Sequence, residues 1–208
     1  VEDPVEYLIE GLSQIQARPE IGLTFAEGLR AILRQSPDVV MVGEIRDGET
    51  ADIAIKASLT GQLVFSTLHT NDAASALTRL IDMDVEPFLV ASSLFLISAQ
   101  RLCRKICQFC REEIKVPKDL LSTLSYQTNT DTKFFSGKGC DKCRRLGYQG
   151  RMGITELLEV DDDIRNLLLK GESSDTIKDF ARKKKGMRTL FEDAMDKCLQ
   201  GQTTLDEV

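Results

Sequence analysis

The chain has 208 residues, of which 42% are apolar and 29% charged, and its net charge is -6. This composition supports the packed core of one or two domains, and the apolar runs fall far short of the roughly 20 residues that a membrane-spanning helix needs. The negative charge argues against a general nucleic-acid-binding protein, because phosphate contacts need clustered lysine and arginine side chains. We therefore expect a globular cytoplasmic protein without a signal peptide.

Strand and helix signals alternate through residues 1–106. The strands are short apolar runs between turn residues, and Thr24 followed by Glu27 has the pattern of a capping box at a helix start. Alternating β and α elements predict an α/β fold with a mainly parallel sheet covered by helices. The expected strands are 39–42 and 63–66, and the expected helices are 24–35, 50–59 and one that begins at Asn71 or Asp72.

The first strand is followed at once by Gly43 and Glu44. A carboxylate at the carboxyl end of a core strand lies where open α/β sheets bind their ligands. The alternative is a buried strand whose last side chain merely reaches solvent, and the segment by itself leaves both interpretations open. The second strand also has a polar end, which contains His69, the only histidine of the chain. A lone histidine is often structural, but the polar neighbours Thr67 and Thr70 favour an accessible ring.

Residues 107–150 contain two Cys-x2-Cys pairs. Four thiolates in two pairs are the ligand set of a closed, structural zinc site. The 29 residues between the pairs exceed the usual spacing, so we expect a loop or small helix from Pro117 to about Ser125. Disulfides and free buried thiols are the alternatives, and a cytoplasmic location disfavours disulfides. The predicted zinc ligands are Cys107, Cys110, Cys140 and Cys143.

Residues 151–208 return to a helical pattern. Gly186 and Gly201 follow the second and third of three periodic segments, as glycine commonly does at helix ends. The basic run Arg182–Lys185 is interpreted as a solvated helix face, with contact to anionic lipid or to a partner as the alternative. The expected helices are 161–170, 174–185 and 189–200, and 203–208 has the pattern of a further helix start.

Three segments, in this order and spacing, resemble the Asp box, Walker B and His box of the secretion ATPases, which are hexameric motors of type II secretion and type IV pilus assembly. These segments are Val1–Glu6, Arg34–Asp47 and Leu63–Asp72. The segment Gly22–Arg34 and the paired cysteines extend the resemblance over nearly the whole chain. Retraction motors of the family lack the four cysteines, and the segments 57–61 and 85–94 favour the type II secretion branch.

The resemblance implies three regions. Residues 1–106 would be part of a RecA-like ATPase core that is incomplete at its N-terminus, 107–150 a tetracysteine zinc subdomain, and 151–208 a C-terminal helical region. It also implies site roles. Glu44 would polarise the attacking water or hold Mg²⁺ through a water, and His69 would sense the γ-phosphate. Glu2 and Asp3 would assist as acidic partners, and the cations that approach the nucleotide phosphates would be Arg30, Arg34 and Arg151.

No Gly-x4-Gly-Lys-Ser/Thr phosphate loop occurs in the 208 residues, although the family has one just before the Asp box. We therefore expect a piece of an ATPase that does not turn over ATP by itself. Its full-length form would bind ATP and Mg²⁺, assemble as a homohexamer and drive pseudopilus or pilus assembly and protein export. Its partners would be inner-membrane platform proteins, and it would lie at the inner membrane as a peripheral protein. The alternative is a non-enzymatic, zinc-bearing interaction module.

Overall fold

The computed structural model describes residues 1–117 and 132–208. Contacts between residues group the chain into two compact units, the first made of residues 1–97 and 158–181 and the second of residues 98–157 and 182–208. Each unit thus combines an early and a late part of the chain. Apart from Pro117, the loop or small helix predicted up to about Ser125 lies outside the described residues.

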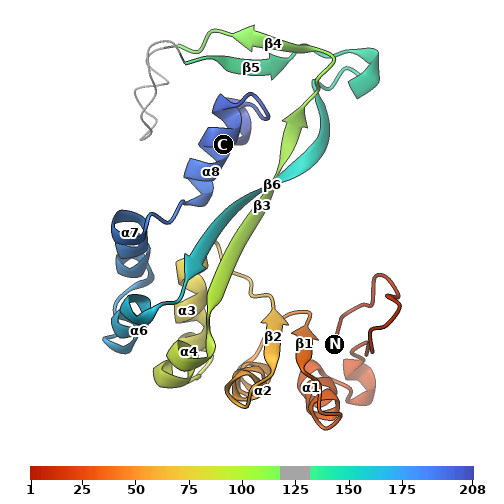
Figure 1. The fold of residues 1–208 in the computed structure, drawn as a ribbon. Coiled ribbons are helices and arrows are strands. Elements are labelled where there is room, and N and C mark those ends of the chain that lie inside the picture. The colour runs from red at the N-terminus through yellow and green to blue at the C-terminus, as the bar shows by residue number, and fades with distance from the viewer. Residues whose placement is uncertain (118–131) are drawn as a thin grey trace. The chain divides into compact units, whose positions relative to one another are not determined.

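The first unit contains a pair of parallel strands (Figure 1). Strand β1 (Val39–Val42) pairs with β2 (Leu63–Ser66), and helix α2 (Gly48–Leu59) provides the crossover that parallel strands need. Both strands have the predicted bounds, because each is a short apolar run between turn residues. The α/β class is therefore confirmed. The other helices of this unit are a 3-10 helix (Pro19–Ile21), α1 (Phe25–Leu33), α3 (Ala73–Asp82), α4 (Pro87–Ser93), α6 (Asp162–Leu169) and α7 (Ser174–Lys185), whose last turn belongs to the second unit.

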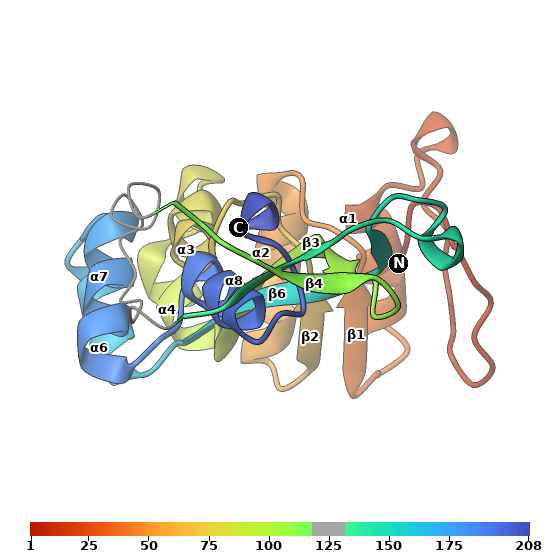
Figure 2. The same ribbon diagram turned by 90° about the horizontal axis from the view of Figure 1, so that it is seen from above.

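Helices α1 and α2 lie on the same side of this strand pair (Figures 1 and 2). Burial alternates along β1, where Val40 and Val42 are buried while Val39 and Met41 are exposed. Since successive side chains of a strand point to opposite faces, the buried valines face the two helices. The core of this unit therefore lies between the strand pair and its helices.

Helix starts in the first unit are fixed by polar side chains. Thr24 accepts a hydrogen bond from the Glu27 backbone N–H, as predicted, but the Glu27 carboxylate pairs with Arg30 and does not return to the cap. Asp72, and not Asn71, begins α3. Each such cap satisfies one of the backbone donors that a helix start leaves without an intrahelical partner. The caps of α1, α2, α3 and α6 are Thr24, Asp47, Asp72 and Asp161.

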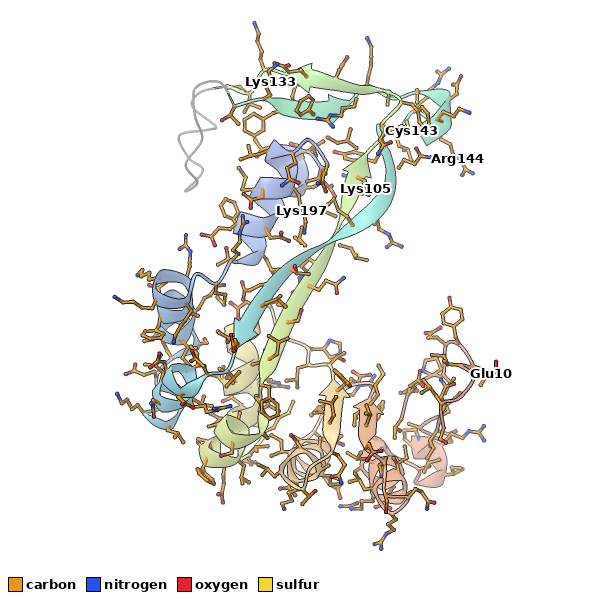
Figure 3. All side chains as sticks on the ribbon, in the orientation of Figure 1. Glu10, Lys105, Lys133, Cys143, Arg144 and Lys197 are labelled. Atoms are coloured by element: carbon orange, nitrogen blue, oxygen red, sulfur yellow. The ribbon has the colours of Figure 1, made fainter. Side chains whose placement is uncertain are left out.

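The second unit is built on strands. The long strand β3 (Leu96–Ile106) pairs with β6 (Tyr148–Glu159), and both begin or end in the first unit. Strand β4 (Arg111–Ile114) pairs in antiparallel fashion with β5 (Phe134–Gly137). Figure 3 shows Lys133, at the start of β5, and Cys143, beyond its end, at opposite ends of this hairpin. The remaining elements are a 3-10 helix (Asp141–Cys143), α8 (Leu190–Leu199) and a 3-10 helix (Leu205–Glu207).

The last residues of the chain are tied to β3. The Thr203 hydroxyl donates to the Arg104 carbonyl oxygen at 2.8 Å, and the Ile106 backbone N–H donates to the Gln202 carbonyl oxygen at 2.9 Å. The Arg104 guanidinium also pairs with the Glu207 carboxylate, at 2.9 Å from its Nε. The helix start predicted at 203–208 is a single 3-10 turn that these contacts hold in place.

Neither β3 nor β6 was predicted. Residues 151–159 form most of β6, although they were predicted to belong to a helical region. Burial alternates from Ile154 to Leu158. This alternation has the period of a strand and not of a helix. In the described residues, β1 and β2 form a two-stranded parallel sheet, which represents the mainly parallel sheet that the sequence predicts.

No helix in the described parts of the chain has both the length and the apolar character needed to cross a membrane.

We expect Asp47→Ala to lower the free energy of unfolding by about 1 kcal/mol. Asp47 Oδ1 accepts the Thr50 backbone N–H at 2.8 Å and its other oxygen contacts the Thr50 hydroxyl, and alanine removes both acceptors. Asp47→Asn keeps an oxygen at the cap and should remain close to the unsubstituted chain. Urea denaturation measures the free energy of unfolding of all three proteins. Equal losses of this free energy in Asp47→Ala and Asp47→Asn would contradict the capping role.

Candidate functional site

The ends of the two parallel strands are bonded to each other. Val42 is opposite Ser66 in the register, and the next residues continue the connection. The Thr67 hydroxyl donates to the Gly43 carbonyl oxygen at 2.7 Å, and the Ile45 backbone N–H donates to the Thr67 carbonyl oxygen at 3.0 Å. This pairing fixes the backbone on both sides of Glu44 and just before His69, so the two residues singled out from the sequence meet at one sheet edge.

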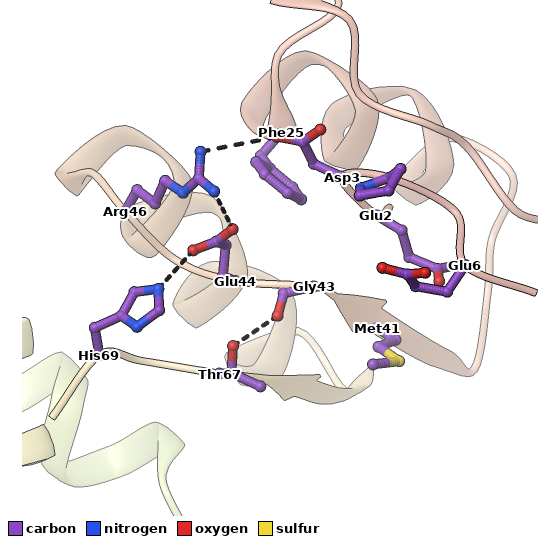
Figure 4. A pocket seen from close by; sticks show the side chains of 11 residues that line it. Glu2, Asp3, Glu6, Phe25, Met41, Gly43, Glu44, Arg46, Thr67 and His69 are labelled. Atoms are coloured by element: carbon purple, nitrogen blue, oxygen red, sulfur yellow. Dashed lines mark hydrogen bonds and ion pairs between the residues drawn. The ribbon is translucent and has the colours of Figure 1, made fainter. Parts of the chain in front are cut away.

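Glu44 and His69 are in direct contact. His69 Nε2 lies 2.9 Å from Glu44 Oε2, and the Arg46 guanidinium donates to the other oxygen, Oε1 (Figure 4). The Arg46 guanidinium and then the His69 ring hold the pKa of the Glu44 carboxyl below its usual range. The Glu44 side chain is 14% exposed and that of His69 is 84% exposed. The accessible ring expected for His69 is thus confirmed, and Glu44 is an ionised, oriented carboxylate.

The N-terminal segment lies against the same strand end. The Gly43 backbone N–H donates to the Val1 carbonyl oxygen at 2.8 Å. Asp3 Oδ2 lies 3.8 Å from the Arg46 guanidinium, while Glu2 Oε1 accepts the Gln14 amide at 2.8 Å. Both predicted acidic partners line the same pocket as Glu44, and Arg46 lies between Asp3 and Glu44.

These residues line an open pocket of about 370 Å³ (Figure 4). Its walls carry four carboxylates, one guanidinium and one imidazole, together with a few apolar side chains. Such an arrangement suits a ligand that brings both negative charge and a cation, since carboxylate oxygens bind hard cations and the basic groups bind anions. The lining residues are Glu2, Asp3, Pro4, Glu6, Phe25, Met41, Gly43, Glu44, Arg46, Thr67 and His69.

The predicted arginines do not line this pocket. Arg30 forms ion pairs of 2.6 Å with Glu27 and with Glu49 of α2. Arg34 is the C-terminal cap of α1, and Arg151 is an exposed residue of β6 in the second unit. Their approach to nucleotide phosphates stays a prediction.

Arg46 and Glu6 are charged residues of the pocket to which sequence reasoning assigned no role. Of the two, Arg46 is in contact with Glu44. It follows Glu44 by two positions in Gly43-Glu44-Ile45-Arg46. In extended backbone, side chains two apart point to the same side, and Ile45 between them is only 6% exposed. A charged pair around a buried apolar residue after a strand is a signal that could have indicated this ion pair.

The four paired cysteines form a cluster in the second unit. Their sulfur atoms all lie within 4.8 Å of one another. The Sγ atoms of Cys107 and Cys140 are 3.9 Å apart, and that of Cys143 lies 3.8 Å from those of Cys110 and Cys140. A tetrahedron with metal–sulfur bonds of about 2.3 Å has edges of about 3.8 Å, whereas a disulfide needs about 2 Å. The cluster could therefore hold a metal, and all six cysteines of the chain, each in its described part, are free thiols.

A close approach of two glycines holds the pairs together. A side chain at Gly137 would place its Cβ 1.9 Å from the Gly147 carbonyl oxygen, which accepts the Cys107 backbone N–H at 2.9 Å. The Gly147 backbone N–H points to Cys143 Sγ at 3.3 Å. Only glycine lets these backbones approach so closely, and Gly147 thereby connects the first cysteine pair to the second.

The thiols of the cluster differ in acidity. Backbone N–H groups, first that of Cys140 and then that of Gly147, lower the pKa of Cys143 to about 6. Desolvation raises the pKa of Cys110 to about 12. Four thiolates so close together repel one another, and a bound dication would offset that repulsion, since metal binding displaces thiol protons. The donor set fits a thiophilic metal. Cys103 and Cys198 lie outside the cluster and are buried.

Together these features define an α/β protein with an acidic, arginine- and histidine-containing pocket at the carboxyl ends of its parallel strands, and with a four-cysteine cluster. The chain belongs to the type II/IV secretion system protein family, whose family model matches residues 1–208.

Individual relatives agree with this assignment. The chain is 52% identical over 210 residues to the type IV pilus assembly ATPase PilB of Thermus thermophilus, a match that covers 100% of this chain and 24% of that protein. It is 51% identical over 208 residues to the type II secretion system protein E of Dickeya dadantii, covering 100% of this chain and 41% of that protein. Among solved structures, the pilus retraction motor PilT with bound ADP aligns with a TM-score of 0.69 at 27% identity, over 99% of this chain and 49% of that one.

The chain thus spans 24% to 41% of the length of these curated relatives. Because the two identities are nearly equal, they do not separate the pilus branch from the secretion branch. The preference for the type II branch stays a prediction.

Proposed function

We propose that this chain is part of an ATP-hydrolysing motor of type II secretion or type IV pilus assembly. The observation that carries this proposal is the meeting of Glu44 and His69 at the carboxyl ends of β1 and β2, in a chain whose relatives are secretion ATPases. A phosphoryl transfer enzyme must orient a water in line with the γ-phosphate and offset the charge of the phosphates. The pocket offers groups for both tasks.

Glu44 is the group proposed to orient and polarise the attacking water. It is ionised, so it can accept a proton from that water. His69 can donate from one ring nitrogen to a γ-phosphate oxygen, and this contact would couple the nucleotide to α3, which begins soon after it. The residues that would hold Mg²⁺, directly or through water, are Glu44, Glu2 and Asp3, and the ion would neutralise phosphate charge there.

Further elements of the proposal rest on the family resemblance. Arg30, Arg34 and Arg151 would approach phosphates in a homohexamer. Residues 1–106 would belong to a RecA-like core, 107–150 to a structural zinc subdomain and 151–208 to a C-terminal region. The motor would act on inner-membrane platform proteins from the cytoplasmic side and bind no nucleic acid. The second candidate, a non-enzymatic zinc-bearing interaction module, rests on the cysteine cluster alone.

The 208-residue chain by itself should neither bind ATP tightly nor hydrolyse it. Its sequence contains no phosphate loop, and the backbone N–H groups and lysine of such a loop provide most of the affinity for the β- and γ-phosphates. Isothermal titration calorimetry with MgATP measures the affinity. A micromolar dissociation constant for the purified chain would contradict this expectation.

Metal analysis should find about one zinc ion per chain, bound by the four sulfur atoms of the cluster. Cys110→Ser removes one ligand and should reduce the zinc content and lower the melting temperature. Cys198→Ser is the matched control, because Cys198 is a buried thiol outside the cluster. If Cys110→Ser keeps its zinc and melts like the unsubstituted chain, the site is wrongly assigned.

In the full-length protein, Glu44→Gln should reduce ATP hydrolysis by at least ~10²-fold, the usual scale for a lost general base. Glutamine keeps the shape of the side chain but not its charge, so nucleotide affinity should largely remain.

His69→Ala should reduce secretion or pilus assembly more than it weakens ATP binding. Steady-state hydrolysis and nucleotide affinity measure both variants, and near-normal turnover of Glu44→Gln would place the catalytic carboxylate elsewhere.

A further inference from the structure

Arg46 connects the two acidic segments of the pocket. One guanidinium nitrogen donates to Glu44 Oε1, and the other lies 3.8 Å from Asp3 Oδ2 (Figure 4). Asp3 belongs to the N-terminal segment and Glu44 to the end of β1, so a single side chain bridges residues 41 positions apart. The planar fork of an arginine suits two carboxylates at once.

The two oxygens of Glu44 have different partners. Oε1 accepts from Arg46, and Oε2 lies 2.9 Å from His69 Nε2. A carboxylate with a charged donor on one oxygen and a ring nitrogen on the other is restrained about its last torsion, and charge-assisted hydrogen bonds are stronger than neutral ones. Each partner therefore limits how far the carboxylate can turn.

The anchored backbone between Glu44 and Arg46 positions their ion pair, which is therefore more than a chance contact between surface side chains. Ile45, between the two charged residues, is 6% exposed, and its backbone N–H is bonded to the Thr67 carbonyl oxygen at 3.0 Å. With Ile45 anchored, Glu44 and Arg46 project from a fixed stretch of backbone. The ion pair follows from the same strand-end geometry that places His69.

The remaining charges of the pocket are mostly negative. Three further carboxylates, those of Glu2, Asp3 and Glu6, line the same space. The basic residues of the lining are Arg46 and His69. Removing the guanidinium would leave Glu44 among three like charges with only the imidazole as a basic partner.

We propose that Arg46 is a positioning residue for the hydrolysis reaction, which holds the Glu44 carboxylate in one orientation. It acts through Glu44 and not on the nucleotide itself. This inference rests on the proposed function, in which Glu44 acts on the attacking water. The competing role is a direct contact between Arg46 and a phosphate, since its side chain is 57% exposed.

Kinetics of the full-length protein distinguish these roles. In Arg46→Gln, kcat should fall by about 10-fold to 10²-fold, the scale of a misplaced catalytic group, with KM for ATP nearly unchanged. A residue that only stabilised the fold would not separate kcat from KM in this way.

Arg46→Lys separates charge from geometry. Lysine keeps the positive charge, but a single ammonium group cannot bridge Glu44 and Asp3 in the same way. Its kcat should lie between those of the unsubstituted protein and Arg46→Gln. Arg79→Gln is the matched control, since Arg79 is an exposed arginine of α3 that does not line the pocket.

Three results would overturn the inference. A raised KM with unchanged kcat in Arg46→Gln would mean that Arg46 binds the nucleotide. If Arg46→Gln had the same kinetics as Arg79→Gln, the ion pairs of Arg46 would be surface contacts without a role in hydrolysis. A reduced kcat in Arg46→Gln that Arg46→Lys restores in full would mean that positive charge alone, and not the bridging geometry, is needed. Glu44→Gln, measured beside them, keeps the two proposals apart, because its normal turnover would refute the catalytic carboxylate itself.

Discussion

The parallel pairing of β1 with β2 is the constraint on which the candidate site depends. Its register places Val42 opposite Ser66, and the bonds of Gly43 and Ile45 to Thr67 extend the pairing past the strand ends. Glu44 and His69 are 25 residues apart in the chain and become neighbours through this register alone. Because a slip of one residue would turn every side chain to the opposite face of the sheet, the buried Val40 and Val42 also fix which side chains reach the pocket.

The second unit depends on a different constraint, the close approach of glycine backbones around the four cysteines. Gly137 and Gly147 leave no room for a side chain, and Gly147 bonds to both cysteine pairs. The β4–β5 hairpin is small, with few residues to bury, and small units of this kind commonly depend on a bound metal for their stability. The first unit thus has its apolar core between the strand pair and its helices, whereas the second unit combines the sulfur cluster with a small apolar cluster around Cys103, Ile154 and Ala194.

Local signals predicted much of this structure. The bounds of β1 and β2 were predictable because each is an apolar run between turn residues, and the start of α1 because Thr24 and Glu27 form a recognisable pattern. The cysteine cluster was predictable because metal ligands come in fixed spacings. Strands β3 and β6 were not, since β3 mixes apolar with charged residues and β6 contains Gly150 and Gly153. Their pairing is between distant segments, and no local pattern encodes it.

Ion pairs were the least predictable feature. Arg30 pairs with Glu49 because α1 packs beside α2, and Arg46 reaches Asp3 because the N-terminal segment lies on the end of β1. Both contacts depend on tertiary packing, which helix and strand periods do not specify. The sequence therefore indicated Glu44 and His69 through the polar ends of their strands. The spacing of Glu44 and Arg46 could have indicated their ion pair, but nothing in the sequence indicated the contact between Arg46 and Asp3.

The most direct test of the catalytic role proposed for Glu44 is a crystal structure of the full-length protein with Mg²⁺ and a non-hydrolysable ATP analogue. The account predicts that a water in line with the γ-phosphate lies at hydrogen-bond distance, about 2.6–3.2 Å, from the Glu44 carboxylate, with His69 next to a γ-phosphate oxygen. A nucleotide bound in catalytic geometry with its γ-phosphate and in-line water out of reach of Glu44 would contradict the account.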